Sequence, residues 1–179
     1  MLTYTIHNHC HNFSAWAASR AASVIGNRFT VEHGRGLLEA IGFGSKLDSP
    51  DKLPEPEKVD RIHRTWRQEI ISFGTKQELV ITHGVAAKLI NVYLKSRFVC
   101  GGFADSPKVQ ALHPPIDSLL LQKLACDNFG GKAKFWSNAY RARWSKFDSD
   151  TYENVIQEIR ESLKGEPMWK IERFWEGHQ

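Results

Sequence analysis

Apolar residues recur at helical spacing in one segment after another, and this periodicity constrains the fold more than any other feature. The clearest segment runs from about Glu57 to Phe73, with Val59, Ile62 and Trp66 on one face. Residues three and four positions apart share one side of an α-helix, so each segment has a face to bury against a neighbour. The β-rich segments that a sheet needs are missing. The sequence therefore predicts an all-α fold, a compact helical bundle.

Capping residues and glycines divide the chain into the expected helices. Asn12 and Thr30 are plausible N-caps, and either Asp148 or Ser149 opens a later helix. Gly42 and Gly74 each end one. The expected helical ranges are residues 13–25, 31–41, 57–73, 76–81, 85–99, 116–126, 136–144, 150–163 and 167–175.

Length and composition indicate one globular domain. The chain has 179 residues, with 41% hydrophobic and 25% charged residues, and no repeat or linker divides it. We expect a single domain over residues 1–179, with Met1 to His11 as a flexible terminus. No apolar run approaches the roughly 18 residues of a membrane span, and the terminus lacks the apolar core of a signal peptide. We therefore expect a cytoplasmic protein with no membrane contact.

Neither the cysteines nor the histidines predict a metal or a cofactor. Cys10, Cys100 and Cys126 have no short pairing motif, so we expect reduced thiols. The five residues from His7 to His11 include three histidines and a cysteine, but no second ligand pair accompanies them. The net charge of +4 permits a polyanionic partner without requiring one.

The stretch from Thr82 to Ala125 holds the residues best suited to chemistry. A glycine turn at Gly84 opens a helix, where free backbone N–H groups and the positive end of the dipole favour a phosphate. Lys88 follows one turn later on an otherwise apolar helix. Asp117 begins another helix after a rigid Pro-Pro segment. A lysine and a carboxylate at these places point to a cleft between two helices.

This arrangement resembles the helix-hairpin-helix DNA glycosylase superfamily. There, a hairpin of the type Leu-Pro-Gly-Val-Gly-x-Lys is followed some tens of residues later by Val-Pro-x-Asp. Residues 84–88 match the end of that hairpin and its lysine, and residues 115–117 match the segment that leads to the aspartate. His83 stands where the motif has proline, and Ala86 where it has its second glycine. The likeness covers about 45 residues.

The resemblance implies a function, a partner and a set of site residues. Asp117 would stabilise the positive charge on the sugar as the base leaves, and Lys88 would attack the sugar C1′, which also permits strand cleavage as an apurinic-site lyase. The partner would be double-stranded DNA, bound without an obligatory protein partner by a monomer. The DNA contacts that we expect, in addition to the catalytic pair, are His83, Gly84, Val85, Ala86, His113, Arg141 and Arg143.

Two substrate classes fit the resemblance. The spacing of Lys88 and Asp117 is similar to that of compact 8-oxoguanine glycosylases with an atypical hairpin. The chain also resembles compact bacterial glycosylases of anti-phage defence, which remove glucosylated hydroxymethylcytosine, and the departures from the motif favour this specialised class. Six tryptophans are many for this length. Most should lie in the core, and one or two are candidates for stacking on a flipped base.

Simpler interpretations remain for each residue. A helical lysine is usually a solvated side chain whose stem covers apolar surface. Asp117 is by default an N-cap, worth about 1 kcal/mol. His113 suits a local hydrogen bond as well as it suits DNA, and Arg141 and Arg143 suit a solvated basic stretch. The alternative function is a non-catalytic helical DNA-binding module that needs neither Lys88 nor Asp117.

Overall fold

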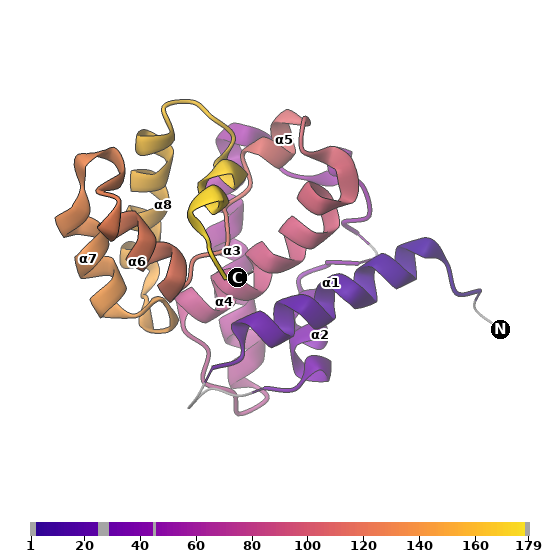
Figure 1. Cartoon of the computed structure of the whole chain (residues 1–179). Helices are drawn as coiled ribbons and strands as arrows, with labels where there is room; N and C mark the ends of the chain where they lie inside the picture. The colour runs from indigo at the N-terminus through magenta and orange to yellow at the C-terminus, as the bar shows by residue number, and fades with distance from the viewer. Residues whose placement is uncertain (1–2, 25–28, 45, 178–179) are drawn as a thin grey trace.

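The computed structural model describes residues 3–24, 29–44 and 46–177, and the regular secondary structure within these ranges is helical (Figure 1). These ranges hold no strand and only isolated bridge residues, as between Phe43 and Leu47, so the predicted all-α class is confirmed for them. They also hold no helix that is long and apolar enough to cross a membrane. The α-helices are α1 (Ile6–Ala22), α2 (Val31–Ala40), α3 (Val59–Thr75), α4 (His83–Leu94), α5 (Pro107–Gln110), α6 (Ser118–Cys126), α7 (Ala133–Ala142) and α8 (Ser149–Leu163).

Shorter helical turns connect these helices. Five are 3-10 turns, and a longer π-helical segment directly continues α4. The 3-10 turns are η1 (Pro50–Lys52), η2 (Pro56–Lys58), η4 (Phe129–Gly131), η5 (Trp144–Lys146) and η6 (Met168–Phe174), and the π-helical segment is η3 (Lys95–Phe103).

Helix α4 lies at the centre of the molecule. Every residue from Gly84 to Asn91 is buried, which is the pattern of a helix enclosed on all sides. Helices α1, α3 and α8 pack against it, and α6 packs against α7. Figure 1 shows α1 on one side of α4 and the group of α6, α7 and α8 at the other end. A side chain on α4 therefore reaches either the core or a pocket between these groups.

Helix α1 begins earlier than predicted. Thr5 and Asn8 form a reciprocal cap, in which each backbone N–H donates to the other residue's side chain, so the helix begins at Ile6. The prediction that Asn12 caps this helix is therefore wrong, and residues 6–11 of the terminus that we expect to be flexible are helical. The predicted end at Ile25 lies outside the described residues.

Three other predicted boundaries are also wrong. Residues 76–81 form turns instead of a helix, with Glu78 at a φ of 59°. The helix expected over 85–99 changes at Leu94 into the π-helical η3. Helix α7 begins at Ala133 and ends before Arg143, whose φ of 62° interrupts the helical backbone.

The turn after α7 docks on the start of α4. The N–H of Gly84 donates to the Phe147 carbonyl at 3.1 Å, and the Thr82 hydroxyl donates to the Ser145 carbonyl at 2.8 Å. A Cβ on Gly84 would lie 1.8 Å from the Trp144 carbonyl oxygen. Glycine is therefore required here because another backbone approaches closely, and this approach fixes where Trp144 stands relative to α4.

We predict that Gly84→Ala destabilises the protein by about 2 kcal/mol or more, because the Trp144 backbone must move to admit a methyl group. Urea denaturation measures the change in unfolding free energy. Gly36→Ala is the matched control: it also lies within a helix, and a Cβ there meets nothing within 4 Å. That variant should be neutral, or more stable by up to about 1 kcal/mol. Equal stability of both variants would contradict the packing described here.

Candidate functional site

The side chains of Lys88 and Asp117 meet although 29 positions separate them. The Lys88 Nζ lies 3.0 Å from the Asp117 Oδ2. Asp117 is also the N-cap of α6, because its Oδ1 accepts the Leu120 N–H at 2.9 Å. The same Oδ2 accepts the indole N–H of Trp175 at 2.9 Å. Both oxygens of this carboxylate are thus held in place, and the predicted pair forms one site.

The surroundings of Lys88 make its amine unusual. Its side chain is 8% exposed, against 20% for that of Asp117. Burial lowers the pKa of Lys88, and the neighbouring charge of Asp117 opposes that shift without cancelling it. The Nζ also lies 5.5 Å from the ring centroid of Trp144. A lysine with a lowered pKa is more readily deprotonated, and the neutral amine is the form that acts as a nucleophile or base.

The pair opens into a pocket of about 390 Å³. A second ion pair, between Lys95 and Glu172, borders the same space, and burial raises the pKa of Glu172. The Lys95 Nζ lies 5.3 Å from the ring centroid of Trp175. The pocket is lined by Ala21, Lys88, Val92, Lys95, Ser96, Pro115, Asp117, Trp144, Glu172 and Trp175.

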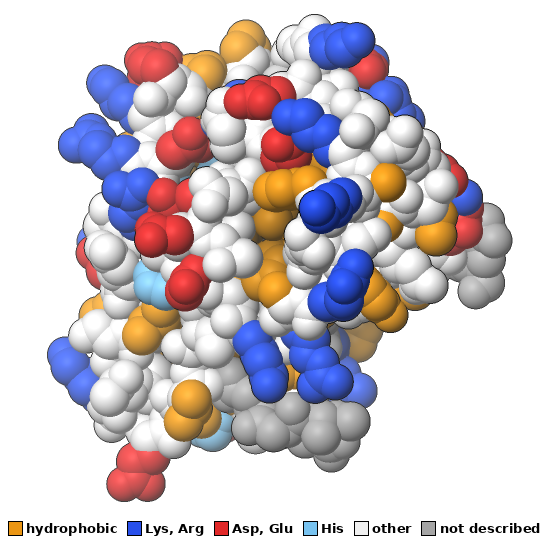
Figure 2. Space-filling view, turned by 90° about the vertical axis from the view of Figure 1, so that its left-hand side faces the viewer, with side chains coloured by type: hydrophobic (Ala, Val, Ile, Leu, Met, Phe, Trp, Pro, Cys, Tyr) orange, Lys and Arg blue, Asp and Glu red, His pale blue; other side chains and the backbone are white. Residues whose placement is uncertain are grey.

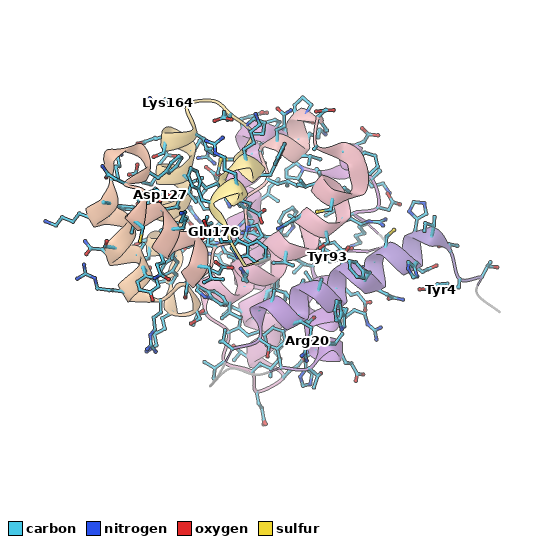
Figure 3. All side chains as sticks on the ribbon, viewed as in Figure 1. Tyr4, Arg20, Tyr93, Asp127, Lys164 and Glu176 are labelled. Carbon is cyan, nitrogen blue, oxygen red and sulfur yellow. The ribbon has the colours of Figure 1, made fainter. Side chains whose placement is uncertain are left out.

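The C-terminal segment supplies one wall of the pocket. Glu172 lies on η6 and Trp175 directly follows it. An ion pair of 3.1 Å between Lys123 and Glu176 ties the segment to α6, and Figure 3 places the labelled Glu176 where this segment crosses the middle of the molecule. The sequence did not single out Glu172 or Trp175 for this site, because only the folded chain brings residue 175 to residue 117.

Lys95 was also missed, but the sequence does carry a signal for it. Lys88, Val92 and Lys95 are spaced by four and three positions, so they lie on one face of a continuous helix. The helix continues through Leu94 into η3 and keeps Lys95 on the pocket side. The periodicity of α4 could therefore have identified two lysines facing one cavity.

A buried polar network lies behind the catalytic candidates. Asn91 donates from Nδ2 to the Pro114 carbonyl and to the Tyr152 hydroxyl, both at 2.9 Å. Its Oδ1 accepts from the His63 Nε2 at 2.8 Å. The Tyr152 hydroxyl in turn donates to the His113 Nδ1 at 3.1 Å. The direction of each bond follows from the Asn91 amide and makes the His113 Nδ1 an acceptor, so this imidazole is neutral, while burial lowers the pKa of His63.

His113 belongs to this network. Its Nε2 lies 2.8 Å from Asp60 Oδ1, its Nδ1 contacts Tyr152, and the residue is 4% exposed. The hydrogen bond from His113 lowers the pKa of Asp60. Since both ring nitrogens have partners inside the protein, the structure gives His113 a bracing role at the Pro114 end of the Asp117 segment, and the predicted DNA contact gains no support.

The start of α4 is occupied by other parts of the protein. The N–H of Gly84 donates to Phe147, and the N–H groups of Val85 and Ala86 donate to the side chain and the carbonyl of Thr82. The Nδ1 of His83 lies 3.3 Å from Arg67. Val85 and Ala86 are also buried. These amides have partners already, so the geometry does not support the phosphate site that the sequence predicts at this turn.

Arg141 and Arg143 lie at the surface, shortly before Trp144 in the sequence. Both are exposed at the end of α7, directly before the pocket residue Trp144. Neither has an ion pair with any residue in the described part of the chain. Within those same ranges, no group of three histidine, cysteine or acidic residues has a geometry that could hold a metal ion.

Comparisons with protein-family models, with curated proteins and with solved structures give no match for this chain. The site geometry therefore carries the functional argument.

We predict that stability falls as the pH drops below about 6.5, because burial lowers the pKa of both His63 and His113. A lowered pKa means that the unfolded chain binds these protons at a higher pH than the folded chain does. The stability that the two neutral imidazoles contribute is therefore fully present above pH 6.5. It is lost on acidification, at up to about 1.4 kcal/mol per pH unit for each imidazole.

Denaturation at pH 8, 7, 6 and 5 measures this dependence. His63→Phe should reduce the slope of the unfolding free energy against pH, because one titrating group is removed. Replacing the exposed His9 by Gln should leave that slope unchanged. A wild-type profile that is flat between pH 7 and pH 5 would contradict the neutral assignment of the buried imidazoles.

Proposed function

We propose that this chain is a DNA glycosylase that excises a modified base flipped out of the duplex. The observation that carries the proposal is the buried Lys88 amine, 3.0 Å from the Asp117 carboxylate, at the wall of a pocket bordered by two tryptophans. A nucleophile, a carboxylate and an aromatic cavity are the groups that base excision needs. The resemblance of residues 84–88 and 115–117 to the glycosylase motif supports the same conclusion.

Asp117 and Lys88 have complementary roles in the proposed reaction. As the bond between C1′ and the base nitrogen breaks, the base leaves with the electron pair and takes up a proton, and positive charge grows on the sugar. The Asp117 carboxylate stabilises that charge. The neutral Lys88 amine attacks C1′ and gives one proton to the departing base. The C1′–O4′ bond of the sugar ring then breaks, the second amine proton passes to O4′, and the resulting Schiff base permits strand cleavage. If water attacks instead, Lys88 lines the site and Asp117 keeps its role.

The pocket has the properties of a base site. Trp144 and Trp175 offer aromatic surfaces for a flipped base, and Val92 and Pro115 add apolar contact. Lys95 and Glu172 place a hydrogen-bond donor and an acceptor at the wall. The proposed substrate is a modified base, either glucosylated hydroxymethylcytosine of phage DNA or an 8-oxoguanine-like lesion.

The proposed DNA contacts are side chains at the pocket rim. Arg141 and Arg143 are exposed, and they precede a tryptophan that lines the pocket. Figure 2 views the side that carries α6, α7 and α8, where lysine and arginine side chains lie to the right of and below a band of apolar side chains, and acidic side chains lie above it and to its left. Arginine and lysine side chains supply most phosphate contacts of DNA-binding proteins, so a basic rim would hold the duplex while the base enters the cavity.

We predict that Asp117→Asn lowers base release by at least about 100-fold, since it removes the charge that stabilises the transition state. DNA affinity should change little. The matched control is Asp148→Asn, because Asp148 also caps a helix, accepting the Thr151 N–H at 2.8 Å, but lies outside the pocket. Unchanged base release by Asp117→Asn would contradict the proposal. DNA binding without any base release by the wild type would favour a non-catalytic DNA-binding module.

Borohydride reduction tests the covalent role of Lys88. The wild type should give a covalent adduct with substrate DNA, Lys88→Gln should give none, and Lys76→Gln, at an exposed lysine outside the pocket, should leave the adduct intact. Persistence of the adduct in the Lys88 variant would exclude Lys88 as the nucleophile.

A further inference from the structure

We propose that Asn91 is a positioning residue that holds Asp117 opposite Lys88, through the carbonyl of Pro114. Lys88 and Asn91 lie three positions apart on α4, and Asp117 lies three residues after Pro114. The same helix thus carries the amine and also the side chain that anchors the carboxylate segment. The inference concerns the site of the proposed glycosylase, but its test needs no substrate.

The amide of Asn91 is fully used and cannot rotate without losing bonds. Both Nδ2 hydrogens are donated, to the Pro114 carbonyl and the Tyr152 hydroxyl, and Oδ1 accepts from His63. Asn91 is 0% exposed. A buried amide that satisfies both donors and its acceptor has one stable orientation, since any rotation would leave polar atoms unpaired.

The segment from Pro114 to Asp117 depends on this external anchor. Pro114 and Pro115 have no N–H groups, so they can be held only through their carbonyls and their packing. Both prolines and Ile116 are buried, which leaves no water to replace the bond from Asn91. Fixed φ angles at two consecutive prolines make the segment stiff, so an anchor at Pro114 is transmitted to Asp117.

A second anchor acts one residue earlier. His113 contacts Tyr152 on α8 and Asp60 on α3, and Asp60 also pairs with Arg160 at 2.6 Å. His113 therefore fixes the direction from which the chain approaches the Pro114 to Asp117 segment. Asn91 fixes the distance between that segment and α4. Among the described residues, the Asn91 bond is the one hydrogen bond, besides that of Lys88 with Asp117 itself, that links the segment to α4.

The test measures the reactivity of Lys88 in the intact chain. A lysine-acylating reagent is applied over a range of pH, and mass spectrometry of the peptide that contains Lys88 gives its apparent pKa. The charged groups that act on Lys88 are Asp117 and Glu172, which raise its pKa, and Lys95, which lowers it. Asp117→Asn should therefore lower the apparent pKa of Lys88, because one attractive charge is lost.

Asn91→Leu should shift the apparent pKa of Lys88 in the same direction as Asp117→Asn. If Asn91 acts through Asp117, the double variant should show no further shift beyond that of Asp117→Asn. His63→Phe is the structural control: it removes another partner of Asn91 and should lower stability without moving the Lys88 pKa. Where Asn91→Leu does not fold, Asn91→Ser takes its place, with the same direction expected.

An unchanged Lys88 pKa in a folded Asn91 variant, or additive shifts in the double variant, would overturn the proposal. These outcomes are independent of base release, so they separate failure of the positioning role from failure of the glycosylase function. On a substrate, the Asn91 variant should lower kcat by about 100-fold with KM nearly unchanged, as expected when a reacting group is displaced by about 1 Å. An increase in KM with kcat unchanged would instead assign Asn91 a role in substrate binding and would contradict the positioning role.

Discussion

The buried ion pair of Lys88 and Asp117 is the interaction on which the rest of the site depends. A lysine amine on an enclosed helix loses its hydration, and this loss is tolerated only if a partner with good geometry replaces the water. Asp117 supplies that partner, and Trp175 and the first turn of α6 hold its two oxygens. The residual cost appears as a lowered pKa of Lys88. A buried amine with a lowered pKa is more typical of a reactive site than of an ion pair that only stabilises the fold.

The close approach at Gly84 links this pair to the molecular surface. Because the Trp144 carbonyl rests against Gly84, the Trp144 ring stands beside Lys88 and also lines the pocket. The preceding residue, Arg143, has a φ of 62° and is exposed. The turn that positions an aromatic wall of the pocket thus also carries an exposed arginine, which is one of the proposed DNA contacts. The sequence predicts DNA contacts both at the two arginines at the end of α7 and at residues 83–86.

The sequence predicted the features that depend on local patterns. Periodicity predicted the all-α class and the clear helices α3, α4 and α8, and motif spacing predicted that Lys88 and Asp117 belong to one site. The start of α1 was missed because a polar, histidine-rich segment becomes helical through its Thr5 cap. Asn91, Glu172 and Trp175 were missed because their roles come from contacts across 23, 77 and 58 positions, which no local pattern encodes.

Mass spectrometry of the bases released from a panel of damaged DNAs and modified phage DNAs tests the central claim most directly. The account predicts that the protein frees one modified base, glucosylated hydroxymethylcytosine or an oxidised guanine, leaves normal bases in place, and loses this activity when Asp117 loses its charge. Binding of DNA with no base released from any member of the panel would contradict the account. The buried pair would then be a structural feature of a helical DNA-binding protein.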